Sequence, residues 1–236
     1  KYEWCNLLII NDKIRDVFIR QVEEPRQEEK LKSELPSLEG ITNKISVKVR
    51  KQYEESPYPR WINLGLQLEP APISRFIDEI KLKLFDDKIN YVETPNILIA
   101  GCGTGQHSLT SARRFRNSKV LAVDLSLSSL AYAKRKTQEL SIKNIEYMHA
   151  DILDLHKLKK QFDLVECGGT LVCMDEPLVG WRLLTDCLKP GGLMKIGLYS
   201  ELARQHIVKM REEISQLGIG SNNKDMKLFR MKIIKS

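Results

Sequence analysis

From residue 96 onward, short apolar runs alternate with longer stretches in which apolar positions recur every three or four residues. The first run, Asn96–Ala100, lies between a proline and a glycine, which is typical of a strand buried on both faces of a sheet. The other predicted strands are 119–123, 145–148, 162–167 and 193–199. The predicted helices are 106–115, 127–140, a short one near 155–161, 177–188 and an amphipathic one at 202–217.

This alternation of strands and helices predicts the fold class. It indicates an α/β protein with a Rossmann-like, doubly wound and mainly parallel sheet that has helices on both faces. Right-handed crossovers place the first strand near the middle of the sheet, beside the point where the strand order reverses. Ligands bind there, beyond the carboxyl ends of the strands. The residues that follow the strands are therefore the candidate site.

The first 95 residues have a different pattern. Charged helical stretches are predicted over 12–22, 27–32, 41–53 and 73–85, separated by proline-rich breaks. Pro57 and Pro59 hold one break extended, because proline fixes φ and biases its predecessor away from helix. We expect a helical N-terminal segment over 1–95 whose proline-rich stretch is a lid or linker, a core over 96–200, and a C-terminal helix with a basic tail over 201–236. Residues 224–235 are predicted to be a helix or tail.

Composition narrows the classes of protein that this chain can be. Its 236 residues are 42% apolar and 29% charged, which argues against disorder. The longest apolar runs are far shorter than the roughly 20 residues of a membrane span. The net charge of +7 lies after residue 95, and it permits a nucleic-acid or acidic partner without indicating one. Five cysteines without a C-x-x-C pair and four scattered histidines predict reduced thiols in a cytoplasmic protein and no metal site.

A glycine-rich turn follows the first predicted strand and opens a helix. Its sequence, Gly101-Cys-Gly-Thr-Gly105, lets the backbone turn sharply and approach a ligand closely. The spacing is shorter than G-x-G-x-x-G and lacks the Lys-Ser/Thr of a P-loop, so it suits an adenosine with a small polar tail. Asp124, at the end of the second strand, could accept hydrogen bonds from a ribose diol. Asp151 could accept one from an adenine amine while Ile152 covers the ring.

These residues resemble the ordered motifs of class I S-adenosylmethionine-dependent methyltransferases. The resemblance covers roughly residues 95–200 and rests on the stretches 97–105, 150–152, 162–168 and 188–192 together with Asp124. It implies S-adenosylmethionine as the cofactor and S-adenosylhomocysteine as the product. The implied cofactor-binding residues are Gly101, Cys102, Gly103, Thr104 and Gly105 for the methionine part, Asp124 and Leu125 at the ribose, Asp151 and Ile152 at the adenine, and Glu166, Cys167 and Gly168 near the sulfonium.

The segment before the core narrows the resemblance. Gln52-Tyr-Glu-Glu-Ser-Pro-Tyr-Pro-Arg-Trp61 is similar to a Q-Y-E-x-x-P-Y-P-R-W signature of bacterial methyltransferases that often carry tetratricopeptide repeats upstream. Residues 124–133 and 196–204 also look like that group. The resemblance implies that the chain is the methyltransferase part of a longer protein with an upstream repeat region, in agreement with a start at Lys1 rather than Met.

Two features depart from the family pattern. Many relatives have a histidine after the fourth strand, whereas residues 169–175 contain none. The class I sheet normally ends in an antiparallel hairpin, for which residues 218–236 are short and charged. A histidine general base at the first position and a complete sheet are therefore not expected here.

The resemblance implies in-line transfer of a methyl group to an unidentified acceptor, which the sequence leaves open between RNA, protein and a small molecule. Because the leaving group is already good, a general base is needed only where the acceptor must lose a proton. The candidates for that base are Tyr53, Tyr58 and Glu166, with Glu54 and Glu55 nearby.

The role of the proline-rich stretch stays open. In one interpretation Tyr58 and Trp61 pack as a lid; in the other, Tyr53, Tyr58 and Arg60 line the cofactor or acceptor pocket. Two further functions also stay open: a regulatory module that binds S-adenosylmethionine without catalysis, and a nicotinamide-dependent oxidoreductase. The glycine spacing and Asp151 argue against the oxidoreductase.

Overall fold

The computed structural model describes residues 10–66, 69–220 and 222–235. The chain falls into two compact units, Lys1–Gly197 and Leu198–Ser236. The first unit contains the N-terminal helices and the sheet, and the second contains the helices after the last strand. Cys5 lies outside the described residues, and the other four cysteines are free thiols, as expected for a reduced protein.

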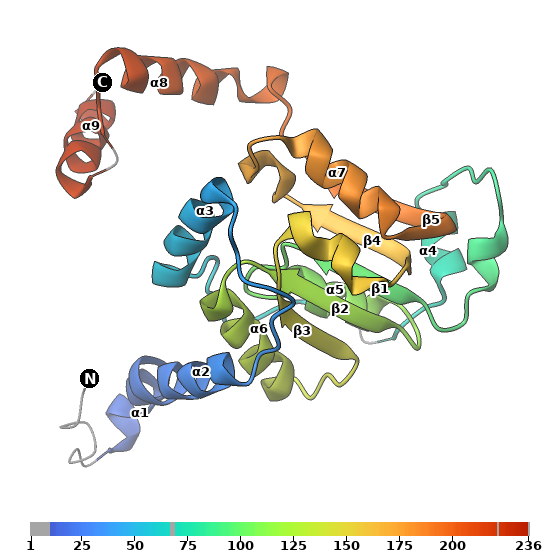
Figure 1. Ribbon diagram of the computed structural model, residues 1–236. Coiled ribbons are helices and arrows are strands. Elements are labelled where there is room, and N and C mark those ends of the chain that lie inside the picture. Colours follow the sequence, from blue (N-terminus) through green and yellow to red (C-terminus); the bar gives the residue numbers. More distant parts are fainter. Residues whose placement is uncertain (1–9, 67–68, 221, 236) are drawn as a thin grey trace. The chain divides into compact units, whose positions relative to one another are not determined.

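The first unit is built on a five-stranded parallel sheet with the strand order β3-β2-β1-β4-β5 (Figure 1). Its strands are β1 (Asn96–Ala100), β2 (Lys119–Asp124), β3 (Ile145–His149), β4 (Phe162–Gly168) and β5 (Leu188–Gly197). Each pairing is parallel. The sheet reverses its strand order at β1, which stands in the middle. The predicted Rossmann-like fold and the central place of the first strand are confirmed.

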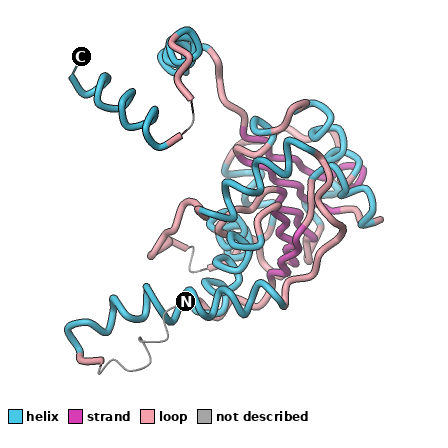
Figure 2. Tube along the Cα trace, turned by 60° about the vertical axis from the view of Figure 1, so that its left-hand side comes forward, coloured by secondary structure: helices cyan, strands magenta, loops and turns pink. Residues whose placement is uncertain are grey.

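Helices cover both faces of this sheet, as the tube in Figure 2 shows for the strands in magenta. They are α5 (Gln106–Arg114), α6 (Leu127–Glu139), the 3-10 helix η4 (Ile152–Leu158), the 3-10 turn η5 (Leu171–Cys173) and α7 (Pro177–Asp186). Ser126 caps α6 by accepting a hydrogen bond from Ser129 N, as the sequence predicts.

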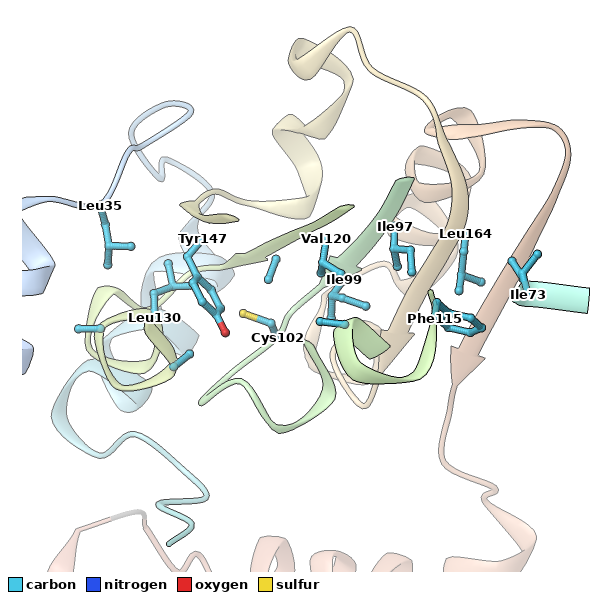
Figure 3. Close-up of a cluster of buried hydrophobic side chains, with 14 of the residues drawn as sticks. Leu35, Ile73, Ile97, Ile99, Cys102, Phe115, Val120, Leu130, Tyr147 and Leu164 are labelled. Carbon is cyan, nitrogen blue, oxygen red and sulfur yellow. The ribbon is translucent and has the colours of Figure 1, made fainter. Parts of the chain in front are cut away.

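Two hydrophobic clusters lie on the two faces of the sheet, because successive side chains of a strand point to opposite sides. On one face, Ile97 and Ile99 of β1 pack with residues of α5 and α6. Figure 3 shows this cluster as a row of side chains that runs from Leu35 to Ile73. On the other face, Leu98 packs with side chains from η4 and α7. The inner strands β1 and β2 are therefore buried on both faces, which explains why their sequences are almost wholly apolar.

The N-terminal segment is helical, as predicted, but its helices have other bounds. They are α1 (Asp12–Phe18), the π-helical η2 (Ile19–Glu23), α2 (Glu24–Ser33), α3 (Lys44–Glu55), α4 (Ile73–Glu79) and the 3-10 helix η3 (Lys88–Tyr91). The two expected helices over 12–32 form one helical run, since a proline is tolerated in the first turn of α2.

Helix α4 is shorter than predicted, and its C-terminus explains why. Lys81 adopts a left-handed φ of 54°, and Leu82 N donates to Ile77 O at 3.0 Å. This is the six-to-one hydrogen bond of a Schellman motif, which ends a helix. Residues 80–85 therefore leave the helical path that their composition suggested.

Two predicted boundaries in the core also differ. The fifth strand begins at Leu188 rather than after the glycines, and the pairing with β4 shifts register between Phe162 and Leu164. The Lys-Pro-Gly-Gly stretch is thus an irregularity inside a strand rather than a turn before it. The short charged helix expected near 155–161 is the 3-10 helix η4, which begins directly at Ile152.

The second unit consists of the 3-10 turn η6 (Leu202–Arg204), α8 (Gln205–Gln216) and α9 (Asn223–Lys235). Both predicted helices are present. Its described residues contain no strand, so no antiparallel hairpin completes the sheet in the part of the chain that the structure describes. Within the described ranges, every helix is too short or too polar to traverse a lipid bilayer.

Candidate functional site

The glycine loop leaves β1 in a conformation that ordinary residues adopt rarely. Gly101, Gly103 and Gly105 have φ values of 71°, 52° and 89°, which lie in the left-handed region. The N–H groups of Gly101 and Cys102 both donate to Val123 O of β2, at 2.9 and 3.0 Å. Gly105 is the N-cap of α5. The loop is therefore fastened to the neighbouring strand and delivers the chain into the helix.

Asp124, at the end of β2, fastens the same loop. Its Oδ2 accepts from Gly103 N at 2.8 Å, and its Oδ1 accepts from Ser126 N at 2.9 Å. Burial raises the pKa of this carboxyl, although the backbone N–H donors oppose the shift. Each oxygen has accepted one backbone hydrogen bond and can accept another. The carboxylate can therefore hold the loop and still bind two hydroxyl groups.

Asp151 and Ile152 follow β3. Asp151 is 3% exposed and its Oδ1 caps η4 by accepting from Leu153 N at 3.0 Å. His149, the last residue of β3, contacts Leu125 O with Nε2 at 3.0 Å and Ser37 Oγ with Nδ1 at 3.1 Å. Burial lowers the pKa of His149, which favours the neutral ring. The histidine thus joins the ends of β2 and β3 to the N-terminal segment.

These strand ends open into a cavity of about 470 Å³, within the usual size range of small-molecule sites. It brings together eleven of the residues expected to act in binding or catalysis. They are Gly101, Cys102, Gly103, Thr104, Asp124, Leu125, Asp151, Ile152 and Gly168 of the core, and Tyr53 and Tyr58 of the N-terminal segment. The carboxyl ends of β1, β2, β3 and β4 therefore share one site with the N-terminal segment.

Five other expected residues do not line this cavity. Gly105 lies beneath α6, where a Cβ atom would stand 2.7 Å from Ala133 Cβ. Cys167 is 1% exposed and packs in the cluster beneath α7. The remaining three are Glu166, Arg60 and Trp61, which contact protein groups instead.

Glu166 lies on β4 and is 3% exposed. Its Oε2 accepts from the hydroxyl of Ser111 and lies 3.0 Å from His107 Nε2. Burial raises the pKa of Glu166, but His107, Ser111 and Lys195 together outweigh it and leave the pKa below its ordinary value. The carboxylate is therefore ionised and already engaged, behind the wall of the cavity rather than in it.

Arg60 and Trp61 fix the proline-rich stretch over the glycine loop. Trp61 Nε1 donates to Thr104 O at 2.9 Å, and Thr104 Oγ1 donates to Pro59 O at 2.6 Å. Arg60 binds Glu28 at 2.9 Å and stands over the ring of Tyr132. Trp61 therefore packs against the protein, as in the first interpretation of this stretch. Tyr58, by contrast, is 75% exposed and lines the cavity.

Glu54 also has a role within the fold. Its two carboxylate oxygens accept from Leu127 N and Ser128 N, at 2.8 and 2.9 Å. A carboxylate at a helix N-terminus stabilises the helix by pairing with free N–H groups and with the dipole. Glu54 therefore fastens α3 to α6 and is not free to act as a base.

Sequence reasoning missed several residues that line the cavity. From α3 and its cap come Asn43, Ile45, Ser46 and Val49; from the helices after the strands come Gln106, His107 and Ser129; and from the segment after β4 come Gly169, Thr170, Cys173, Met174, Asp175, Glu176 and Val179. His107 could have been found, because it stands two residues after the glycine loop, in the first turn of the next helix. The residues of α3 carry no local signal, since tertiary packing alone brings them to the site.

Comparison with known proteins supports one family. Residues 97–192 match a family model described as a methyltransferase domain. An uncharacterized protein of Synechococcus sp. is 33% identical over 124 residues, 52% of this chain and 30% of that protein. Malonyl-(acyl-carrier protein) O-methyltransferase 1 of Ilyobacter polytropus is 29% identical over 140 residues, 59% of this chain and 48% of that protein.

A solved structure also aligns with part of this chain. PKMT2 from Rickettsia typhi in complex with AdoHcy aligns over 61% of this chain and 29% of its own, with 25% identity and a TM-score of 0.46. The chain thus spans less than half the length of each of these three proteins. Over residues 97–192, which include the glycine loop, most of β1 and all of β2 to β4, the chain matches the methyltransferase domain family.

Proposed function

We propose that this chain is a methyltransferase that uses S-adenosylmethionine to methylate an acceptor still to be identified. One observation carries the proposal. A single cavity collects the glycine loop, Asp124 and Asp151 at the ends of three adjacent strands, within the segment that matches a methyltransferase domain. Asp124 and Asp151 lie at successive positions along the sheet, as a ribose and an adenine would.

The cavity fits an adenosine with a polar tail. Ser129 Oγ is buried, lines the cavity and has no hydrogen-bond partner among the described residues, which suits a site that takes a polar ligand. Gly103 presents open backbone, where a Cβ atom would approach only Tyr58 O, at 3.8 Å. Asp124 keeps free acceptor capacity on both oxygens. Asp151 Oδ2 has no hydrogen-bond partner among the described residues.

In this proposal each strand end holds one part of the cofactor. Asp124, with Leu125 beside it, accepts from the ribose hydroxyls, and Asp151 accepts from the adenine amine while Ile152 covers the ring. Gly101 and Gly103 let the backbone approach the methionine part. S-adenosylmethionine supplies an activated methyl group, so the protein mainly aligns the two reactants and excludes water.

The acceptor enters through the part of the cavity that the cofactor leaves free. That part is bordered by α3 and by residues 169–179. Among the candidate bases, Tyr53 and Tyr58 line the cavity, whereas Glu166 lies behind its wall. The two tyrosines are therefore the better candidates for contact with the acceptor, which we leave open between RNA, protein and a small molecule.

Several finer assignments belong to the same proposal. Similarity of the Gln52–Trp61 stretch to the bacterial repeat-associated group supports an upstream tetratricopeptide region, and free thiols support a cytoplasmic setting. A regulatory module without catalysis and a nicotinamide oxidoreductase gain no support from the match to a methyltransferase domain.

Calorimetric titration tests the proposal. The chain is titrated with S-adenosylmethionine, S-adenosylhomocysteine and NAD⁺, and then incubated with methyl-labelled cofactor and fractions of bacterial RNA, protein and metabolites. We expect both sulfur compounds to bind, NAD⁺ not to bind, and label to appear in one fraction. Binding of NAD⁺ alone would refute the proposal, and cofactor binding without any labelled fraction would favour the regulatory module.

A further inference from the structure

The charges that line the cavity are unevenly distributed. Four lining residues are acidic, namely Asp124, Asp151, Asp175 and Glu176, and none is Lys or Arg. His107 is the one basic side chain among the lining residues of the described chain. The proposed cofactor carries a sulfonium, an ammonium and a carboxylate. The acidic lining suits the two cations, but the carboxylate needs a cationic partner.

The position of the His107 ring suits that partner. On one edge of the ring, Nε2 lies 3.0 Å from Glu166 Oε2. On the other edge, Nδ1 and Cε1 lie 3.9 Å from where a Cβ atom of Gly168 would stand, and Gly168 lines the cavity. No interaction of Nδ1 with another described residue is present. The ring therefore has one nitrogen facing Glu166 and the other beside the cavity.

Glu166 faces one edge of this ring. Its carboxylate is 3% exposed and lies 3.0 Å from Nε2. Ser111 of α5 donates to the same carboxylate, and Lys195 of β5 stands 3.8 Å from its other oxygen. These contacts keep Glu166 ionised and fix its position, so the carboxylate orients His107 rather than reaching the ligand itself.

The place of His107 along the sheet agrees with the order of the cofactor's parts. Asp151 follows β3 and Asp124 ends β2, whereas His107 lies beside the end of β4, on the far side of β1. A ligand with adenine at β3 and ribose at β2 would place its tail there. His107 is also in the first turn of α5, where the helix dipole disfavours a cation and favours an anion. A bound carboxylate removes that conflict.

We propose that His107, oriented by Glu166, binds the carboxylate of the cofactor's amino-acid tail. This inference rests on the proposed function, since it assumes a ligand with such a tail. His107 is a cofactor-binding residue in this view, and Glu166 is a positioning residue. The glycine loop then lets the backbone approach the tail closely, whereas the side chain that recognises the carboxylate of the tail comes from α5.

Two ligands that differ in the tail test the inference by calorimetry. S-adenosylhomocysteine carries the tail, whereas 5′-methylthioadenosine keeps the adenosine and the sulfur and lacks it. In His107→Gln the dissociation constant for S-adenosylhomocysteine should rise roughly 10- to 100-fold, as for loss of a hydrogen bond between charged groups. The constant for 5′-methylthioadenosine should change less than about two-fold. His156→Gln is the matched control, because His156 is exposed and, among the described residues, its ring hydrogen-bonds to Leu153 O alone.

The outcomes separate the inference from the proposed function. If wild-type protein binds neither ligand, the proposed function fails. If wild type binds both and His107→Gln weakens both equally, or weakens neither, the tail assignment is overturned. Thermal melting followed by circular dichroism verifies that the variant is folded, and His107→Asn replaces it if it is not.

Glu166→Gln tests the positioning role in a double-mutant cycle with His107→Gln. If Glu166 acts only by orienting His107, its replacement should weaken binding of S-adenosylhomocysteine, leave binding of 5′-methylthioadenosine unchanged, and cause no further loss in a variant that already lacks His107. Additive losses, or an equal loss for both ligands, would refute the positioning role.

Discussion

The structure predicts that replacing glycine by alanine lowers the free energy of unfolding by different amounts at two positions of the glycine loop. Both have left-handed φ, 71° at Gly101 and 52° at Gly103, so an alanine at either position costs about 1–2 kcal/mol of strain. The Cβ atom of alanine at 103 would meet only Tyr58 O, at 3.8 Å. At 101 it would stand 2.0 Å from Thr170 Oγ1 and 2.6 Å from Thr170 Cβ. Rotation of the threonine side chain cannot move its own Cβ atom.

Gly101→Ala should therefore add an overpacking cost of about 1–3 kcal/mol to the strain. We expect Gly103→Ala to lower the free energy of unfolding by about 1–2 kcal/mol and Gly101→Ala to lower it by about 2–5 kcal/mol. Urea unfolding followed by circular dichroism measures both values. Calorimetry with S-adenosylhomocysteine reports whether the loop still binds the ligand.

Thr170→Gly provides the control for this comparison, because it removes every atom that the new methyl group would overlap. In a double-mutant cycle with Gly101→Ala, the two changes should couple by about 1–3 kcal/mol. Equal costs at the two glycines, or no coupling with Thr170, would refute the reasoning. In that case the segment after β4 moves freely and does not fix the loop.

Three other predictions follow from single side chains. Asp124→Ala should weaken binding of S-adenosylhomocysteine by about 1–3 kcal/mol, because the ribose hydroxyls of the ligand lose their hydrogen-bond acceptor. Near wild-type affinity in calorimetry would mean that the ribose binds elsewhere. Arg60→Ala should leave that affinity unchanged, because Arg60 does not line the cavity. It should lower the free energy of unfolding by at most about 1 kcal/mol, because Arg60 is partly exposed. A large loss of affinity would mean that Arg60 contacts the ligand. Burial lowers the pKa of His149, so the unfolded chain binds more protons and stability should fall as pH drops below about 6.5. In His149→Gln, urea unfolding at about pH 7.5 and about pH 5 should show a smaller difference than in wild type, and an equal difference would contradict this assignment.

The core of the fold could be predicted from the sequence because its signals are local. The inner strands β1 and β2 are apolar over most of their length, since both of their faces are buried, and the motif glycines and carboxylates stand at or just after the strand ends. Handedness of the crossovers then limits the strand order. The positions of Gly103, Asp124 and Asp151 follow from that order alone, and all three line the same cavity.

Helix ends in the N-terminal segment were harder to predict, because tertiary contacts determine them. Helix α4 ends at Glu79 and is terminated by the left-handed Lys81 two residues later, although lysine has no special preference for that conformation. The N-terminus of α6 is capped from outside by Glu54, 73 residues away from Leu127 in the chain. No window of neighbouring residues contains that information.

Sequence and structure differ most in the roles that they assign to charged residues, again because tertiary contacts determine those roles. In the sequence, Arg60 stands in a conspicuous Pro-Tyr-Pro-Arg-Trp stretch and is a candidate for lining the cofactor or acceptor pocket. In the structure it binds Glu28, whereas His107 stands beside Gly168 at the end of β4. Residues 169–175 contain no histidine, yet a histidine from another element reaches the end of β4. If His107 binds the tail, the chain supplies a histidine to this region from α5, and a search for function by motif position alone would miss it.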